Sequence, residues 1–360
     1  MRIKPNKPGW IVHKFEDLVE NAREQVMPIK EDSKKYIGLE HLDSGSLHVR
    51  RWGTKIQLKG TKFRMKKCDL LFARRNAYLK RVAIAPHDGL FSAHGMIFRS
   101  KNDVILPDFL PFFISSDLFM DRAIEISVGS LSPTINWGTL RHEGFSLPPL
   151  DEQKRLADLL WSVDETIEHY IKLANKIYII YLLKLKEIRE HKEGRKKIGD
   201  IANLHYGVGL KKKDRCNGAY SVIGSSGIVG KHSKFLVEGP GIIIGRKGSA
   251  GEIIWVKKNF WPIDTTFWVE IKNNKVMLKY FFHALKSINL ASLKITTAIP
   301  GINRNDILSK KIYIPKYSIQ LKIIKKFEEI WTTLDSLNAQ ITCTRNIQKQ
   351  IINKIFGGQS

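Results

Sequence analysis

The same helix entrance occurs twice in the chain, 167 residues apart. The stretches LPPLDEQ at 147–153 and IPKYSIQ at 314–320 both carry proline at the second position and glutamine at the last. At the same offset, SPTIN at 132–136 matches IPGIN at 299–303 in its proline, isoleucine and asparagine. Self-similarity at a fixed period indicates a duplicated structural unit. The repeat therefore predicts a chain built from two copies of one arrangement.

Apolar residues recur after each entrance at alternating spacings of four and three. The first seam contains Leu156, Leu160, Val163, Ile167 and Tyr170, and the second contains Ile323, Phe327, Ile330, Leu334, Leu337 and Ile341. This rhythm, held over several heptads, is typical of helices packed along a coiled-coil stripe. Proline suits the first turn of a helix, because that turn has no partner for the missing amide. We therefore expect two long helices, the first of them roughly 65 Å long.

The segments before the two helices are of another kind. Runs such as DLLFARR at 69–75 and GIIIGRKGSAGEIIWV at 241–256 are rich in strand-forming residues and are separated by glycine, proline and asparagine turns. We expect an α+β fold in four parts: a domain at 1–146, a helix at 147–194, a second domain at 195–313 and a helix at 314–360. A single large domain with two ordinary buried helices is the alternative, but it does not account for the matched prolines, asparagines and seams.

The net charge indicates a polyanionic partner. Lys and Arg number 60 against 35 Asp and Glu, which gives a formal net charge of +25 and a pI of about 9.8. A membrane-surface protein would gather such charge on one amphipathic helix or tail, whereas here it is spread along the chain. The spread favours a broad footprint on DNA or RNA.

The cysteine spacing and the apolar runs bear on metal binding and on the location of the protein. Cys68, Cys216 and Cys343 lie too far apart for zinc-ligand spacing, so no structural metal is expected. The first 18 residues, MRIKPNKPGWIVHKFEDL, lack the apolar core of a signal peptide. The strongest apolar run, IYIIYLL at 177–183, is far shorter than the roughly 20 residues that cross a bilayer. We expect a cytoplasmic protein without a membrane partner.

Several stretches, in their order along the chain, resemble the specificity subunit of type I restriction-modification systems. YIGLEHLDSGSL at 36–47 is similar to the family's first-domain strand and turn, and LPPLDEQKRLADLLWSVDETI at 147–167 to the start of its central helix. GRKGSAGEIIWVKKNFWPIDTTFWV at 245–269 resembles the core of a recognition domain, with FARRNAYLKRVAIAPHDGLFSAHGMIF at 72–98 as a diverged first copy. The resemblance covers nearly all of the chain. The second entrance departs from the family by lacking an acidic residue before its glutamine.

The resemblance implies a non-catalytic subunit that binds double-stranded DNA. In that family, each of two target-recognition domains reads one half of a split target, and the two long helices pair antiparallel and dock two methyltransferase subunits. Restriction subunits complete the full complex. The implied cofactors belong to those partners, S-adenosylmethionine to the methyltransferase and ATP with Mg²⁺ to the restriction subunit, and none is expected in this chain. We expect the helix pair to act as a ruler that fixes the spacer between two half-sites.

Two groups of residues are candidates for DNA contact. Side chains that suit base edges are Arg74, Arg75 and Asn76 in the first domain, and Arg246, Lys247 and Ser249 in the second. Arginine can bind guanine with two hydrogen bonds, and asparagine can bind adenine in the same way. The residues that suit phosphate are Arg50, Arg51, Lys211, Lys212 and Lys213. For each of them the alternative is a solvated cation or a hairpin turn without DNA contact.

Other chemistries have weaker support. Asp264, Glu270 and Lys272 follow the order found in metal-dependent nucleases, so a stand-alone or fused DNA endonuclease is the alternative function. Asp264 lies only six residues before Glu270, which leaves little chain for a separate strand and turn. GIIIGRKGS lacks the spacing of an ATP phosphate loop. The chain also lacks the Asn/Asp-Pro-Pro-aromatic tetrapeptide of adenine methyltransferases, and His41 and His94 are lone histidines. A basic scaffold or RNA binder is the remaining alternative.

Overall fold

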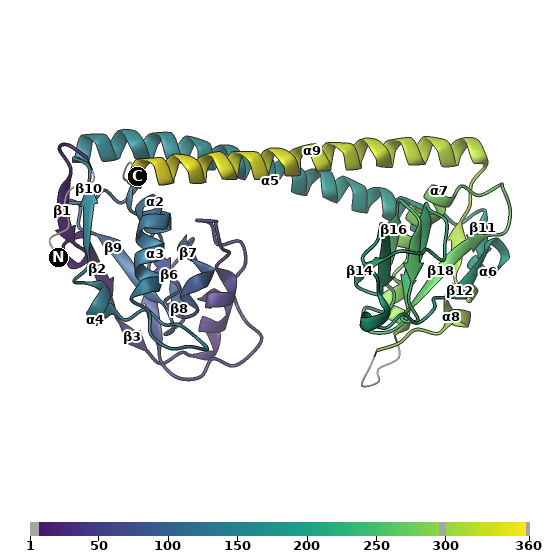
Figure 1. Cartoon of the computed structure of the whole chain (residues 1–360), viewed down its shortest axis with the longest axis horizontal. Coiled ribbons are helices and arrows are strands. Elements are labelled where there is room, and N and C mark those ends of the chain that lie inside the picture. The colour runs from purple at the N-terminus through teal and green to yellow at the C-terminus, as the bar shows by residue number, and fades with distance from the viewer. Residues whose placement is uncertain (1–6, 295–299, 358–360) are drawn as a thin grey trace. The chain divides into compact units, whose positions relative to one another are not determined.

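Two compact units make up the chain. One contains Met1–Tyr170 and Gln340–Ser360, and the other contains Ile171–Ala339. The computed structural model describes residues 7–294 and 300–357, so Ile299 of the second repeated motif lies outside the described residues. Two long helices, α5 (Leu150–Glu190) and α9 (Tyr317–Phe356), each contribute to both units (Figure 1).

In the residues that the structure describes, the first unit contains three sheets. Its main sheet has the order β2 (Val19–Ala22), β9 (Met96–Ser100), β6 (Leu70–Phe72), β7 (Val82–Ile84), with all neighbours antiparallel. A second sheet has the order β3 (Gln25–Val26), β5 (Lys62–Met65), β8 (Gly89–Phe91), β4 (Tyr36–Ile37), and β1 (Ile11–Lys14) pairs with β10 (Gly144–Leu147). Its shorter helices are α1 (Phe15–Leu18), α2 (Leu110–Ser115), α3 (Asp117–Glu125) and α4 (Trp137–Leu140), with 3₁₀ turns at Lys30–Lys35, Leu39–His41 and Ala77–Leu79.

The second unit repeats this plan. Its main sheet has the order β12 (Ala202–Tyr206), β18 (Thr266–Ile271), β15 (Gly241–Gly245), β16 (Ile253–Val256), again all antiparallel. A second sheet has the order β14 (Gly227–His232), β13 (Tyr220–Gly224), β17 (Phe260–Pro262), and β11 (Arg195–Lys197) pairs with β19 (Lys311–Tyr313). Its shorter helices are α6 (Ile198–Ile201), α7 (Leu278–Lys286) and α8 (Arg304–Ser309), with 3₁₀ turns at Lys212–Asp214 and Leu290–Leu293. The predicted α+β fold with a duplicated domain is confirmed.

The central strands are apolar because both of their faces are covered. All five residues of β15, GIIIG, are buried. Ile242 and Ile244 pack with Tyr280 of α7, whereas Ile243 packs with Phe260 on the other side. Strand side chains alternate between faces, so a run without polar residues is needed to fill both cores. The uninterrupted apolar run of β15 therefore indicates a strand in the centre of the sheet.

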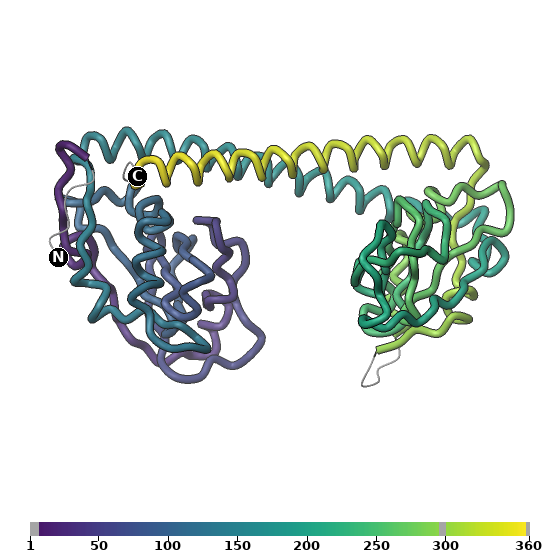
Figure 2. The backbone as a smooth tube through the Cα atoms, in the orientation of Figure 1, coloured from purple at the N-terminus to yellow at the C-terminus, as the bar shows by residue number. Residues whose placement is uncertain are grey.

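The two long helices run antiparallel. In the first unit, Gln348 of α9 donates from Nε2 to the carbonyl oxygen of Leu160 in α5, at 3.5 Å. In the second unit, Tyr181 of α5 packs edge-on against Phe327 of α9, with ring centroids 5.2 Å apart. Residue numbers thus rise along α5 as they fall along α9. Figure 2 shows the last turns of α9 returning to the first turns of α5 within the first unit.

The predicted seams lie on the contact faces of these helices. The buried members are Leu160, Ile167, Phe327, Leu334, Leu337 and Ile341, and the half-buried ones are Leu156, Val163, Tyr170, Ile323 and Ile330. The most buried stripe of α5 also passes through Ala157 and Asp164, one position after Leu156 and Val163. Burial at a residue and its neighbour is expected, because the face that a long helix buries is wider than one row of side chains.

A buried glutamine ties each domain to the start of its long helix. Gln153 accepts a hydrogen bond at Oε1 from the amide of Leu106, and its Nε2 donates to the carbonyls of Val104 and Pro148, all at 2.9 Å. Gln320 makes the same three bonds, also at 2.9 Å, to Met277, Lys275 and Pro315. Gln153 and Gln320 are 1% and 0% exposed, respectively.

These bonds explain why the entrance motif occurs twice. Each glutamine joins the helix to the segment that follows the main sheet, after β9 in the first unit and after β18 in the second. An amide side chain fits because it offers both an acceptor and two donors. An apolar residue there would leave one amide and two carbonyls without these partners, which costs free energy for each group. We refer to Gln153 and Gln320 with these bonds as the glutamine clasps.

We expect Gln320→Met, which keeps the side-chain volume, to lower the free energy of unfolding by about 2–5 kcal/mol, because a buried amide and two carbonyls lose their partners. Chemical denaturation measures the loss, and hydrogen exchange at the Met277 amide localises it. Gln350→Met, at an exposed position of α9, is the matched control and should change stability little. Equal losses for both variants would contradict a structural role for the clasp.

A buried histidine lies where the second domain packs on both long helices. His283 of α7 is 3% exposed, and its ring lies 4.2 Å from that of Phe327 and 6.0 Å from that of Tyr181. Burial lowers its pKa to about 3, and Lys279 and Lys286 act in the same direction. The imidazole is therefore neutral in the folded protein near pH 7.

This pKa predicts a loss of stability in acid. Between about pH 6.5 and pH 3 the unfolded chain binds a proton at His283 that the folded chain excludes, so stability falls as pH falls, by up to about 1.4 kcal/mol per pH unit. Above pH 6.5 the residue contributes no pH dependence. His283→Phe should flatten this part of the stability profile in denaturation series from pH 7 to pH 4.5. The exposed His169→Gln should leave the profile unchanged, and an unchanged profile for His283→Phe would refute the assignment.

Candidate nucleic-acid interface

The repeated Pro-x-Ile-Asn motif supports the turn after the main strand in each domain. The carbonyl of Arg74, which follows β6, accepts a hydrogen bond from the amide of Ile135 at 2.9 Å. The carbonyl of Arg246, which follows β15, accepts one from Ile302 at 3.0 Å. Arg74 and Arg246 therefore occupy equivalent positions. Two predicted base-reading residues thus lie at the same place on two copies of one scaffold.

In the first domain the predicted residues converge. Ser132 receives a hydrogen bond from Nε of Arg75 at 2.9 Å and donates to Oδ1 of Asn76 at 2.8 Å. Asn76 has a left-handed backbone, with φ of 56°, which asparagine tolerates better than most residues. Nε of the half-buried Arg74 has no hydrogen-bond partner among the described residues. The turn therefore presents two guanidinium groups and an amide together.

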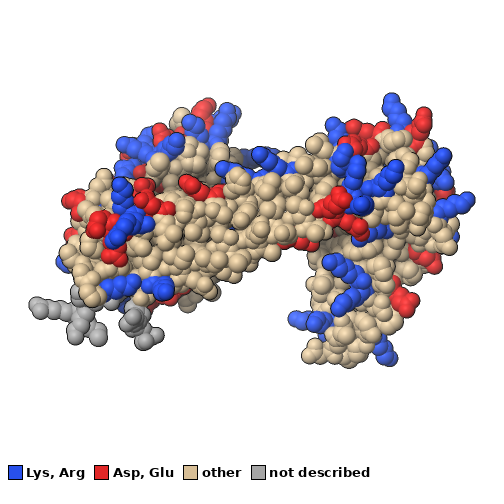
Figure 3. All heavy atoms as spheres, turned by 90° about the horizontal axis from the view of Figure 1, so that it is seen from above, with Lys and Arg blue, Asp and Glu red and all other residues tan. Residues whose placement is uncertain are grey.

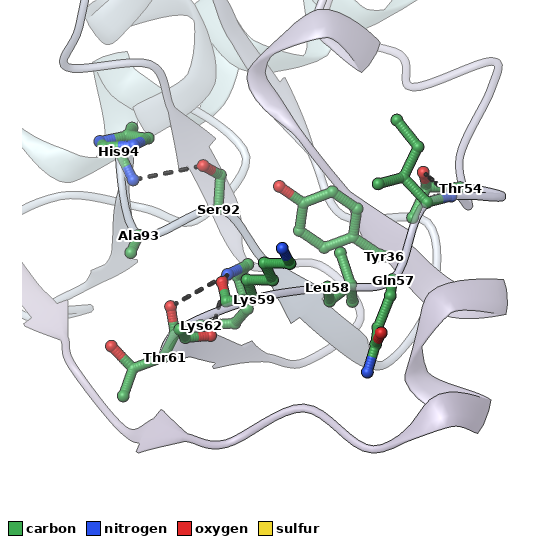
Figure 4. A pocket seen from close by; sticks show the side chains of 12 residues that line it. Tyr36, Thr54, Gln57, Leu58, Lys59, Thr61, Lys62, Ser92, Ala93 and His94 are labelled. Atoms are coloured by element: carbon green, nitrogen blue, oxygen red, sulfur yellow. Dashed lines mark hydrogen bonds between the residues drawn. The ribbon is translucent and has the colours of Figure 1, made fainter.

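A cavity of about 510 Å³ lies in the same domain. Tyr36, Ser92, His94 and Lys62 line it together with residues of the loop at 54–61, and Figure 4 shows the Tyr36 hydroxyl pointing toward Ser92. The pKa of His94 is lowered by partial burial and then by the nearby charges of Arg75, Arg74 and Lys62. Sequence reasoning treated His94 as isolated, but the fold brings it near the cations of the predicted site. The surroundings suit an anionic group.

Arg50 and Arg51 are engaged within the first unit. Arg51 bonds both carboxylate oxygens of Asp43 at 2.8 Å, and this pairing raises its pKa. Arg50 forms an ion pair with Glu168 of α5. The three lysines predicted to contact phosphate, Lys211 to Lys213, are instead exposed and make no ion pair among the described residues. Both groups were predicted to contact phosphate. The two arginines are paired with carboxylates, whereas the three lysines make no ion pair among the described residues.

In the second domain the predicted residues lie on a turn whose backbone is hydrogen-bonded to two other segments. The amides of Arg246 and Lys247 donate to the carbonyl of Thr265 at 2.8 and 3.2 Å. The amide of Gly248 donates to Pro300 at 3.0 Å, and its φ of +73° favours glycine. Lys247 is exposed and Ser249 is half-buried at the end of this turn.

Sequence reasoning missed two residues beside Arg246. The guanidinium carbon of Arg246 lies 4.8 Å from the centroid of the Tyr206 ring, and that of Arg304 lies 5.3 Å from the same ring. Tyr206 ends β12 and Arg304 begins α8, so no local spacing connects them with Arg246. The available signal was that Arg304 directly follows the repeated motif ending in Asn303.

The residues of the nuclease alternative do not gather. Glu270 accepts hydrogen bonds from Asn203 and His205 of β12 at one end of β18, whereas Asp264 lies before the other end. The extended strand from Thr266 to Glu270 alone spans roughly 13 Å, too far for two carboxylates to hold one metal ion. Lys272 donates to the carbonyl of Gly199. Among the described residues, no three His, Cys, Asp or Glu side chains are grouped as metal ligands.

Charges of both signs lie on the face that contains the long helices. Figure 3, which views the protein from the side of the long helices, shows Lys and Arg side chains over both units, mixed with Asp and Glu. The long helices present a broad surface of uncharged residues in the same view. The face seen in this view is therefore not uniformly basic.

Comparison with known proteins matches both copies. The type I restriction modification DNA specificity domain matches residues 8–178 and again residues 191–353. The chain belongs to this family. The duplicated sheets, each followed by a long helix, are thus two copies of the specificity domain, and the resemblance drawn from the sequence is confirmed.

Two curated relatives are type I specificity subunits. The chain is 28% identical over 218 residues to the putative MjaX specificity subunit of Methanocaldococcus jannaschii, across 53% of this chain and 49% of that protein. It is 24% identical over 175 residues to the EcoDI specificity subunit of Escherichia coli, across 47% of this chain and 38% of that protein. Each alignment spans less than half the length of the relative.

Solved structures share the fold. The S subunit of a type I restriction-modification system from M. genitalium aligns over 99% of this chain and all of its own, with a TM-score of 0.59 and 17% identity. A chain from a structure on complex assembly and conformational transition of the type I system aligns equally widely, with a TM-score of 0.60 and 16% identity. In the part of the chain that the structure describes, no helix is long and apolar enough to cross a membrane.

The pairing of the cations predicts unequal effects on DNA affinity. Replacing Lys211, Lys212 and Lys213 together by glutamine should reduce the slope of log affinity against log salt by roughly 2–3, because each phosphate contact contributes about 0.9. Arg51→Gln should change the slope by less than one, since its charge already pairs with Asp43. Fluorescence anisotropy with duplex DNA between 50 and 200 mM salt measures both. A larger effect from Arg51→Gln would reverse the assignment.

Proposed function

We propose that this chain is the non-catalytic subunit that gives a type I restriction-modification complex its DNA sequence specificity. Each specificity domain reads one half of a bipartite target on double-stranded DNA. The observation that carries this proposal is the exact equivalence of Arg74 and Arg246 on two copies of one sheet, each joined to a long helix by a glutamine clasp. A repeated scaffold with different neighbours at equivalent positions suits two half-sites of different sequence.

The partners in this proposal are two methyltransferase subunits and, in the full complex, restriction subunits. Support comes from exposed apolar side chains on α5 within the second unit, which are Leu173, Tyr178, Ile179, Ile180, Leu182 and Leu183. They are 39% to 54% exposed, and clustered apolar residues at a surface favour protein contacts. S-adenosylmethionine would belong to the methyltransferase, and ATP with Mg²⁺ to the restriction subunit.

In this proposal the long helices set the distance between the two DNA-reading domains. Both continue from one unit into the other, over 41 and 40 residues. A helix resists compression because each turn is fixed by backbone hydrogen bonds, so its length is a stable measure. We infer that the helix pair sets the number of unspecified base pairs between the half-sites.

The decisive test is co-expression of the chain with its candidate methyltransferase subunit in a methylation-free host, followed by single-molecule mapping of modified bases. Methyladenine confined to one bipartite motif with a fixed spacer is the expected result. An assembled complex that binds S-adenosylmethionine and yet methylates no such motif would refute the proposal. Binding without any split preference would then favour a basic scaffold or RNA binder.

The same assay tests whether helix length sets the length of the spacer. Removing one heptad from α5 and the matching heptad from α9 shortens each helix by roughly 10 Å, which corresponds to about three base pairs at 3.4 Å each. The mapped spacer should shorten by that number while both half-sites keep their sequence. Whole heptads preserve the buried stripe, so assembly should persist. A shortened protein that retains the original spacer would contradict the ruler, even if the bipartite motif itself stands.

A further inference from the structure

Two arginines share one aromatic ring in the second specificity domain. The guanidinium groups of Arg246 and Arg304 lie over Tyr206, at 4.8 and 5.3 Å from its centroid. Both distances are within the roughly 6 Å over which a cation is attracted to a ring face. Tyr206 is 47% exposed, so the group lies at the surface and is open to a ligand.

The group is held in place by several segments. Nη1 of Arg246 donates to the carbonyl of Asp264 at 3.1 Å, and its backbone is bonded to Thr265 and Ile302. Arg304 begins α8 directly after Asn303, whose side chain accepts from the amide of Asn305 at 2.8 Å. The Arg246 side chain and the backbone that carries Arg304 are thus fixed before binding, which lowers the entropic cost of a specific contact.

The two charges lack a balancing carboxylate. Within residues 7–294 and 300–357, neither Arg246 nor Arg304 takes part in an ion pair, and Nε of Arg304 is buried without a hydrogen-bond partner. Two like charges beside one ring repel each other, so a ligand that accepts hydrogen bonds from both would relieve the repulsion. The chemistry required of that ligand is a pair of nearby acceptors or a negative charge.

The first specificity domain differs at the equivalent positions. Strand pairing places Arg23 where the second domain has Tyr206, because Ala22 faces Ile97 as His205 faces Trp268. The repeated motif places Trp137 where the second domain has Arg304. Trp137 is half-buried and packs against Phe15. The arginine pair over a tyrosine is thus special to the second domain, although the scaffold beneath it is shared.

We propose that Arg246 and Arg304 read guanine in the second half-site, and that Tyr206 is the positioning residue that holds their guanidinium groups. This inference rests on the proposed function. Guanine presents two acceptors, N7 and O6, in the major groove, and arginine is the side chain that binds them with two parallel hydrogen bonds. The carbonyl bond of Arg246 uses one of its five donors and leaves the others for such a contact.

The test is to map methylated motifs for variants of the complete chain in its complex. Arg304→Lys keeps the charge but loses the fork, so discrimination at one G·C pair of the second half-site should fall about ten-fold or more, while the first half-site stays unchanged. Tyr206→Leu should relax the same half-site, and Tyr206→Phe, which keeps the ring, should not. Lys310→Gln, an exposed cation of the same domain, is the control and should leave the motif intact.

Three results would overturn the inference. These are an unchanged motif in Arg304→Lys and Arg304→Gln, an equal loss over all sequences, which would identify a phosphate contact, and a second half-site without any G·C pair. Because Tyr206→Leu can also disturb folding, its melting temperature is measured, and Arg304→Lys decides the question independently. A wild-type chain without a bipartite motif would remove the proposed function as well, so the two failures are distinguishable.

Discussion

The glutamine clasps are the constraint on which the arrangement of each unit depends. A long helix with one apolar stripe can be joined to a sheet at many angles, because packing of apolar side chains has little directional preference. Three hydrogen bonds from one buried amide side chain are directional, and they fix the first turn of the helix against the segment that leaves the main sheet. The clasp therefore converts a loose apolar contact into a defined joint.

The contacts beyond the clasps differ between the two units. In the first, Asp164 of α5 is buried in the stripe, where His48 and Gln348 bond its two oxygens. In the second unit, at the offset of 167 residues, Trp331 occupies the position equivalent to Asp164, and Tyr181 the position equivalent to Gln348. The rings of Trp331 and Tyr181 lie 5.1 Å apart. One joint is polar and the other aromatic.

The histidines at these two joints have opposite pKa shifts. The hydrogen bond to Asp164 raises the pKa of His48, so this contact is strongest below about pH 6.5 and weakens as pH rises through the raised value. His283 is disfavoured in its charged form by burial and contributes in the reverse direction. As pH falls, His48 therefore adds stability until about pH 6.5, and His283 removes stability below that pH, so the two effects lie in separate pH ranges.

Sequence periodicity predicted the elements that repeat, because matched prolines, glutamines and seams leave a signal at fixed spacing. It predicted less of the site. The sequence singled out Arg246 as a candidate because it stands in a glycine-rich turn, but Tyr206 and Arg304 lie 40 and 58 residues from it and meet it only through the sheet and the repeated motif. Likewise, nothing local indicated that Arg51 would pair with Asp43 whereas Lys211 would make no ion pair in the described part of the chain.

The division between shared and differing positions follows from these physical roles. Residues that satisfy buried backbone groups, such as Gln153 and Gln320, cannot vary without loss of stability, so both copies keep them. The exposed residues Arg23, directly after β2, and Tyr206, at the end of β12, have no such duty, and they differ although their positions are equivalent. A duplicated scaffold can therefore hold two chemically different surfaces in equivalent positions, which is what a protein must do to read two unlike half-sites with one fold.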